Sequence, residues 1–261
     1  MEQEELDWKY VVRDMYETAK DAQLTFLAAA LAFYSILSMF PIILLTMTVG
    51  RVIGQNQLGL LLLTFTGDYL TPGLRRQFLE IIQRAAGGRS ITILGFLILI
   101  WSAFRIFRGL DAAFTMIYHT RSVHRSLRER VIDNLVVMAS ITLMGLVVGL
   151  SDFLLNLEAF ASDLFRLVSL FILTIPVFYV YPTTEVTVQD VVPGALLTAS
   201  VITFLRTIFR IYTLETTYTA TSVIGAFMLF TLWFYAASSS VLLGGLLNQS
   251  IMKYRRVKRY E

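Results

Sequence analysis

Long apolar runs separated by short charged segments are the main pattern along the chain. A helix needs about 20 mostly apolar residues to cross a bilayer, and six runs approach or exceed that length. The pattern predicts an all-α, polytopic membrane protein in which residues 1–261 form a single domain with six transmembrane helices. The predicted spans cover residues 24–50, 91–107, 132–151, 164–181, 188–211 and 221–249.

The polar N-terminal segment, residues 1–23, carries apolar side chains at the helical period. Basic residues such as Lys9 and Arg13 fall mostly elsewhere around the same axis. We expect a cytoplasmic amphipathic helix. It could lie on the membrane surface with Trp8 at headgroup depth, or it could pack on the protein's own cytoplasmic face. Its apolar positions are Trp8, Val11, Val12, Met15, Ala19 and Ala22.

A second amphipathic stretch lies within residues 51–90, the long segment between the first two predicted spans. A Thr-Pro pair at 71–72 is typical of a helix start, and a Gly-Gly pair at 87–88 is typical of a helix end. The segment is therefore predicted to be extracytoplasmic, with an interfacial helix over residues 72–86. The residues expected to face apolar surroundings are Leu74, Phe78 and Ile82.

Composition supports a membrane location. Hydrophobic residues make up 56% of the chain, charged residues 16%, and the mean hydropathy is +0.66. A soluble domain carries roughly 25% charged residues, so the apolar excess is expected to face lipid. The chain has no cysteine and two histidines, which excludes thiolate metal sites and cysteine nucleophiles. We expect no metal and no cofactor.

The distribution of basic residues predicts the orientation. Fourteen Lys and Arg residues fall in segments on the N-terminal side of the membrane and eight on the other side. The positive-inside rule then places both termini in the cytoplasm, in the cell (inner or plasma) membrane. The C-terminal tail, residues 250–261, holds five basic residues between Lys253 and Arg259. We expect this tail to bind anionic lipid, each charge adding on the order of 1 kcal/mol.

Enzyme motifs do not occur in the sequence. There is no P-loop, GxSxG, HExxH or paired-carboxylate cluster. The basic segment 119–130, with His119 and His124, is the one candidate for a nuclease site. An inside loop made basic by the topology rule explains it better. The sequence therefore predicts a non-enzymatic protein that does not bind nucleic acid.

Four arginines within or near the spans are the main candidates for a binding site. Arg105 and Arg108 share one helix face, and Arg206 and Arg210 share another. An ionised side chain at the bilayer centre costs at least ~2.5 kcal/mol and tends to face the protein interior. These guanidiniums could line a path for an anionic group such as a lipid phosphate. Alternatively they could snorkel to the headgroups from the ends of their spans. The functional hypothesis is that Arg105 and Arg206 face a shared internal cavity.

Small polar residues within the spans have two interpretations. Tyr34, Ser38 and Asn248 could line the same cavity, or they could hydrogen-bond between packed helices, which is the commoner role. Proline is expected to kink a span, and glycine to permit close helix contact. The residues assigned such structural roles are Pro41, Gly145, Gly149, Pro193, Gly194 and Gly244.

Several short motifs resemble one family. The stretch AAALAFYSILSMFP at residues 28–41 resembles the first-span signature of the YihY/BrkB family of bacterial and archaeal membrane proteins. The resemblance covers nearly the whole chain and implies a six-span inner-membrane protein. Members have carried a ribonuclease label, and lipid movement and resistance traits have been suggested for some. The further similar motifs, in the same order, are WSA (101–103), YP (181–182), PGA (193–195), LWFY (232–235) and LGGLLN (243–248).

Three functions are compatible with these patterns to different degrees. The favoured one is binding or translocation of an anionic lipid or other amphiphile. The alternative is a structural or regulatory membrane protein without a transported substrate. A ribonuclease is the least favoured, because the residues that such chemistry needs are missing. A polar cavity lined from several spans would favour transport, and a dry, closely packed bundle would favour the scaffold.

Overall fold

The structure is a computed structural model that describes residues 7–52, 89–118, 132–133, 135–140, 159–182, 184, 186–215 and 220–259. Its long elements are all α-helices, and no strand occurs among these residues, which confirms the all-α prediction. The helices are α1 (Trp8–Asp21), α2 (Leu24–Val52), α5 (Arg89–Ile117), α7 (Ala159–Val180), α8 (Val188–Glu215) and α9 (Ala220–Arg259).

Within the described residues, three helices are long and apolar enough to cross a membrane: Ile93–Ile117, Val188–Ile208 and Phe227–Lys258. A fourth span results if α1 and α2, which are bent by 66° at their junction, are counted together. The apolar part of α7, Leu164–Val180, is shorter. These helices make the chain a multi-pass membrane protein. The predicted helix at 72–86 and part of the third predicted span lie outside the described residues.

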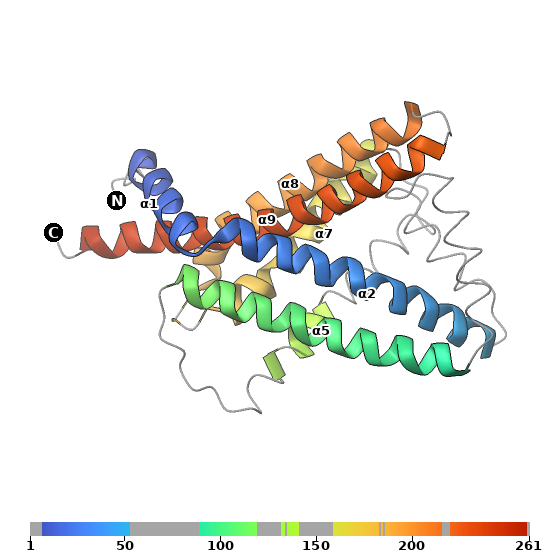
Figure 1. Cartoon of the computed structure of the whole chain (residues 1–261). Helices are drawn as coiled ribbons and strands as arrows, with labels where there is room; N and C mark the ends of the chain where they lie inside the picture. The colour runs from blue at the N-terminus through green and yellow to red at the C-terminus, as the bar shows by residue number, and fades with distance from the viewer. Residues whose placement is uncertain are drawn as a thin grey trace.

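The helices form two arms that converge near the chain termini (Figure 1). One arm pairs α2 with α5, and the other packs α7 on α8 and α8 on α9. α9 also packs on α2 and so joins the arms, while α1 lies against α9. Both termini lie at the same end of the molecule (Figure 1).

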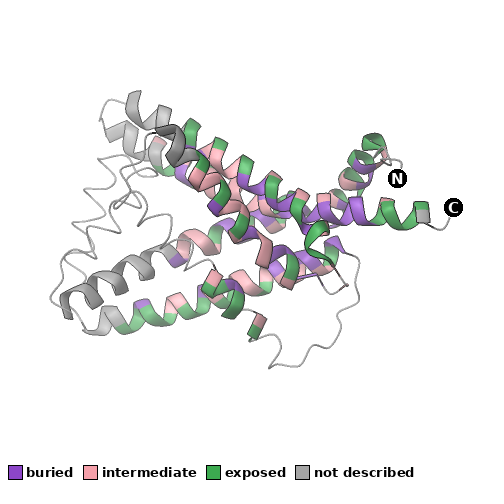
Figure 2. Ribbon diagram, turned by 180° about the vertical axis from the view of Figure 1, so that it is seen from behind, coloured by how far each residue is buried: buried purple, intermediate pink, exposed green. Residues whose placement is uncertain are grey.

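The core lies at this convergent end. It is built from the first half of α2, the last turns of α5 and α7, the first turns of α8 and the second half of α9. Figure 2 shows buried residues concentrated in the same region. Phe114 is fully buried there, 5.5 Å from the Tyr181 ring and 6.0 Å from the Phe178 ring between centroids. Aromatic packing of this kind fixes the arms to each other.

α5 extends ten residues beyond the predicted end of the second span. The expectation that the span ends near residue 107, with Arg105 and Arg108 at its far end, is wrong. Leu110, Phe114 and Ile117 are buried and continue the helical period after the arginines. Packing of this face sustains the helix, so two charges do not mark its end.

α9 likewise continues through the segment predicted as a separate tail. It runs unbroken for 40 residues to Arg259, a length of about 60 Å at 1.5 Å per residue. Ile251 and Met252 are buried beyond the predicted end of the sixth span at residue 249. The basic residues from Lys253 onward are thus carried on a helix that is anchored in the core.

Candidate functional site

Arg105 lies over two aromatic rings on the α2–α5 arm. Its guanidinium carbon is 5.3 Å from the centroid of the Trp101 ring and 5.9 Å from that of the Tyr34 ring. Trp101 precedes it by one turn of α5, while Tyr34 comes from α2. The two rings contact each other nearly at right angles, with centroids 5.6 Å apart. Both distances are within the range of cation–π interactions.

The position of Arg105 in its helix is unusual for a charged residue. It is the central residue of the apolar segment Ile93–Ile117, about 18 Å from either end at 1.5 Å per residue. Its side chain is exposed on the surface of the bundle. Among the described residues it makes no ion pair.

The other three arginines have different surroundings. Arg108 is exposed, with its guanidinium carbon 5.7 Å from the Phe104 ring centroid. Arg206 on α8 is buried, with 8% of its surface exposed. Arg210 lies on α8, but its side chain is outside the described residues. The structure thus places Arg105 and Arg206 in unlike environments, one exposed and one buried.

An apolar groove of about 390 Å³ lies between α2 and α9. Phe33 on the α2 side of the groove contacts Tyr34, with ring centroids 5.3 Å apart. Tyr34 in turn lies beneath Arg105. The groove and the arginine are therefore linked across the exposed surface of α2 by adjacent aromatic rings. The groove is lined by Ala29, Ala32, Phe33, Ile36, Met228, Thr231, Leu232 and Tyr235.

Asn248 lies in the contact between α8 and α9. It is fully buried, and its Oδ1 accepts a hydrogen bond from the Gly194 N–H at 2.7 Å. Its Nδ2 donates to the Val191 carbonyl oxygen at 3.3 Å. Thr198 Oγ1 donates to the Ser240 carbonyl oxygen at 3.0 Å in the same contact. Each bond joins one helix to the other, so these side chains hold the two helices together.

Gly194 and Gly244 permit the close approach of α8 and α9. A Cβ atom at residue 194 would lie 2.2 Å from the Gly244 carbonyl oxygen, and one at residue 244 would lie 2.7 Å from the Gly194 carbonyl oxygen. Both distances are far shorter than van der Waals contact, so a side chain at either position would force the backbones apart. Pro193 lies inside α8, just before this contact. These three residues were assigned structural roles from the sequence.

The remaining predicted site residues are less informative. Ser38 is buried, and its hydroxyl donates to the Ser35 carbonyl oxygen of its own helix at 2.8 Å. Pro41 lies within α2, with its side chain outside the described residues. Gly145 and Gly149 also lie outside them.

Two ion pairs at the end of the molecule that holds the chain termini were missed from the sequence. Asp14 on α1 is 7% exposed, accepts a hydrogen bond from Ser250 Oγ at 2.7 Å and pairs with Lys253 Nζ. Asp190 on α8 pairs with Arg255 at 3.2 Å. The available signal was Asp14 itself, a carboxylate on the same helical face as Val11. Two of the five basic residues assigned to lipid thus have acidic partners within the chain.

Two buried tyrosines lie where α5 and α7 end. Burial raises the pKa of Tyr118, with a smaller contribution from the negative charge of Asp190. Burial also raises the pKa of Tyr181, assisted by Asp111 and then Asp133. Both phenols therefore stay neutral at physiological pH. They act as packing residues around Phe114 rather than as proton carriers.

Comparison with known proteins identifies the family. A search of curated proteins and of solved structures gave no match. The family described as "Virulence factor BrkB" matches residues 15–261, nearly the whole chain. This match confirms the resemblance first carried by the motifs on α2, α5, α8 and α9. The chain therefore belongs to the virulence factor BrkB family of membrane proteins.

Proposed function

We propose that this protein binds an anionic amphiphile within the bilayer and moves it between the leaflets, with Arg105 as the headgroup-binding residue. The observation that carries the proposal is an exposed arginine at the centre of an apolar helix, without an ion-pair partner among the described residues. The proposal involves no chemical reaction.

The first argument is the free-energy cost of placing a charged side chain inside the bilayer. Keeping an arginine charged at the bilayer centre costs at least ~2.5 kcal/mol unless it is compensated. Contacts with Tyr34 and Trp101 offset part of this cost, because cation–π interactions contribute about 0.5–2 kcal/mol. A phosphate or carboxylate that accepts two parallel hydrogen bonds from the guanidinium would offset the rest. The guanidinium of Arg105 is therefore available to bind an anionic ligand.

The groove between α2 and α9 supplies the second argument. It is almost entirely apolar, and its volume of about 390 Å³ is within the range of small-molecule sites. Since Phe33 links it to Tyr34, a ligand with its acidic group at Arg105 could place an apolar chain against this surface. The ligand class that fits both features is an anionic lipid.

Transport of labelled lipids by the purified protein in liposomes tests the proposal. We expect faster flipping of fluorescent phosphatidylglycerol than of phosphatidylcholine, measured by the loss of fluorescence when a reductant is added outside. Arg105→Gln should slow phosphatidylglycerol flipping about tenfold, because a charge-assisted hydrogen bond contributes about 1.5–3 kcal/mol. Arg105→Lys keeps the charge but not the paired donors, so its flipping rate should fall between those of the original protein and Arg105→Gln.

Arg108→Gln is the matched control. Arg108 is also exposed on α5 and lies over one ring, that of Phe104, but it is nearer to the cytoplasmic end. Its replacement should leave flipping within about twofold of the original rate, as expected for a charge that can snorkel. Equal rates for the original protein and Arg105→Gln would refute the proposal.

A scaffold without a transported substrate is the second candidate. The tight α8–α9 contact through Gly194, Gly244 and Asn248 favours it, because this part of the bundle is closely packed. On that alternative Arg105 would meet an acidic group of another membrane protein. Liposomes that contain the purified protein but show no lipid flipping would favour the scaffold.

A further inference from the structure

The structure assigns to α1 a second binding surface, on a face about 130° around the helix from its buried contact with α9 at 100° per residue. We propose that Trp8, Val12 and Tyr16 insert into the inner leaflet and that Lys9 and Arg13 bind the headgroups of anionic lipids there. This site is independent of Arg105 and of the transport proposal. The occupant is the bilayer surface itself.

One face of α1 is already used by the protein. Val11 is fully buried, and Asp14 and Thr18 are nearly so. Asp14 bonds to Ser250 and Lys253 of α9, and the ring of Tyr10 lies 5.5 Å from that of Tyr254. These contacts fix the rotation of α1 about its own axis. The direction in which its other side chains point is therefore determined.

A separate apolar stripe remains exposed on α1. Trp8, Val12 and Tyr16 are 59%, 61% and 72% exposed and follow one another at intervals of four residues. At about 100° per residue, the stripe covers roughly 80° of the helix circumference. Together with Lys9 and Arg13 these residues line a shallow hollow of about 620 Å³. Three large apolar side chains in a row are unfavourable in water, so a surface must cover them.

The charges beside the stripe match an anionic bilayer. Lys9, Arg13 and Lys20 fall in the sector next to the stripe, roughly 100–140° from Trp8 at 100° per residue, whereas Glu17 lies farther around. Arg13 is exposed and bonds to Glu17 at 2.9 Å, which raises its pKa and keeps it fully charged. Basic residues flanking an apolar stripe are typical of helices that lie in the membrane interface.

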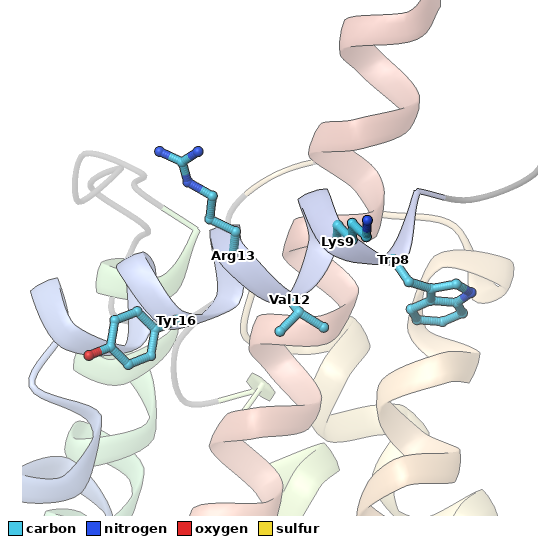
Figure 3. Close-up of a pocket in the computed structure, with 5 residues that line it drawn as sticks. All are labelled: Trp8, Lys9, Val12, Arg13 and Tyr16. Carbon is cyan, nitrogen blue, oxygen red and sulfur yellow. The ribbon is translucent and has the colours of Figure 1, made fainter.

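The orientation of α1 agrees with this occupant. The helix is bent by 66° from α2, so when α2 spans the membrane α1 lies closer to the membrane plane than to its normal. Figure 3 shows Trp8, Val12 and Tyr16 pointing to the side of α1 on which most of the bundle lies, while Arg13 points to the other side. The apolar side chains are thus directed toward the acyl region and Arg13 toward the headgroups.

Spin labelling of the full chain in lipid nanodiscs tests the proposal. Because the chain has no cysteine, single variants Val12→Cys and Tyr16→Cys can each carry one nitroxide, with Glu17→Cys as the matched control. In nanodiscs that contain phosphatidylglycerol, the first two labels should collide with oxygen rather than with a water-soluble nickel chelate. The Glu17 label should show the reverse preference.

The second part of the experiment varies the charge of the lipids in the nanodisc. The label at Val12 should be less immersed in nanodiscs made of phosphatidylcholine alone. It should also be less immersed in phosphatidylglycerol when the chain carries Lys9→Gln and Arg13→Gln, because each charge raises the partition of the helix into the membrane about fivefold.

A Val12 label as accessible to nickel as the Glu17 label overturns the proposal. So does a label shielded from both reagents, which indicates a protein partner or second copy. If the immersion of the Val12 label does not depend on lipid charge, the proposed role of Lys9 and Arg13 is overturned. Arg105→Gln should change none of these readings.

Discussion

The two arms of the molecule treat polar groups in opposite ways. Where α8 meets α9, Asn248 and Thr198 are fully buried, and their hydrogen bonds run from one helix to the other. Where α2 meets α5, Arg105 is exposed at the centre of an apolar helical segment, and its guanidinium lies over two aromatic rings. The first arrangement is complete within the protein, whereas the second has no counter-charge within the part of the chain that the structure describes. The comparison separates side chains that hold the fold from one that is available to a ligand.

The largest effect is expected from a substitution that widens the α8–α9 contact. Gly194→Ala places a methyl group 2.2 Å from the Gly244 carbonyl oxygen, so the backbone must move. We expect a loss of about 1–3 kcal/mol or more, as for overpacked cores, measured as a lower thermal unfolding midpoint in detergent. Gly109→Ala is the control. Its Cβ would meet the flexible end of Leu31 at 2.9 Å and should cost much less.

Removing the buried amide tests the same contact without adding volume. Asn248→Ala leaves the Gly194 N–H without its acceptor, and an unsatisfied buried donor costs about 1–3 kcal/mol. The unfolding midpoint should fall, though less than for Gly194→Ala. Ser239→Ala provides the comparison, because the Ser239 hydroxyl donates to the Tyr235 carbonyl oxygen within its own helix. Equal midpoints for the two variants would show that the interhelical bonds do not stabilise the fold.

The ion pair between α1 and α9 should have a smaller effect. Asp14→Asn keeps an acceptor for Ser250 but removes the charge that faces Lys253. Since the lysine is half exposed and can be solvated, we expect a loss of about 1 kcal/mol, near the upper end for exposed pairs. Glu17→Gln, which disrupts the exposed Arg13–Glu17 pair, should have almost no effect. Limited proteolysis near the N-terminus would detect release of α1 directly.

Arg105→Gln should change stability least. The side chain is exposed and makes no ion pair among the described residues, so the free energy of unfolding should stay within about 0.5 kcal/mol of the original. A clear loss of stability would mean that Arg105 supports the fold, as Asn248 does. The two arms would then no longer differ.

The sequence predicted the all-α class, because long apolar runs leave few alternatives in a membrane. It failed at the ends of α5 and α9. Charges at Arg105 and Lys253 suggested helix ends, while the buried residues beyond them, such as Phe114 and Met252, continue each helix. Burial depends on which neighbouring helix covers a residue, and a single sequence does not contain that information.

The candidate site was predicted in part. Gly194 and Gly244 were chosen as packing residues because small residues at helix contacts follow a general rule, and the structure places their backbones close together. The pairing of Arg105 with Tyr34 could not be predicted, because the two residues come from different helices and meet only when α2 packs on α5. For the same reason the partners of Asp14 and Asp190 were missed.

The unbroken length of α9 makes it a rigid lever. From Gly244, where it crosses α8, to Arg259 the helix extends about 22 Å at 1.5 Å per residue. A tilt of about 10° at that crossing would swing the far end by roughly 4 Å for a rod of this length. Asp14 and Asp190 bind this C-terminal part of α9 through their ion pairs with Lys253 and Arg255. A small rearrangement among the spans would therefore displace the C-terminal end of α9, and the displacement would grow with distance from the crossing at Gly244.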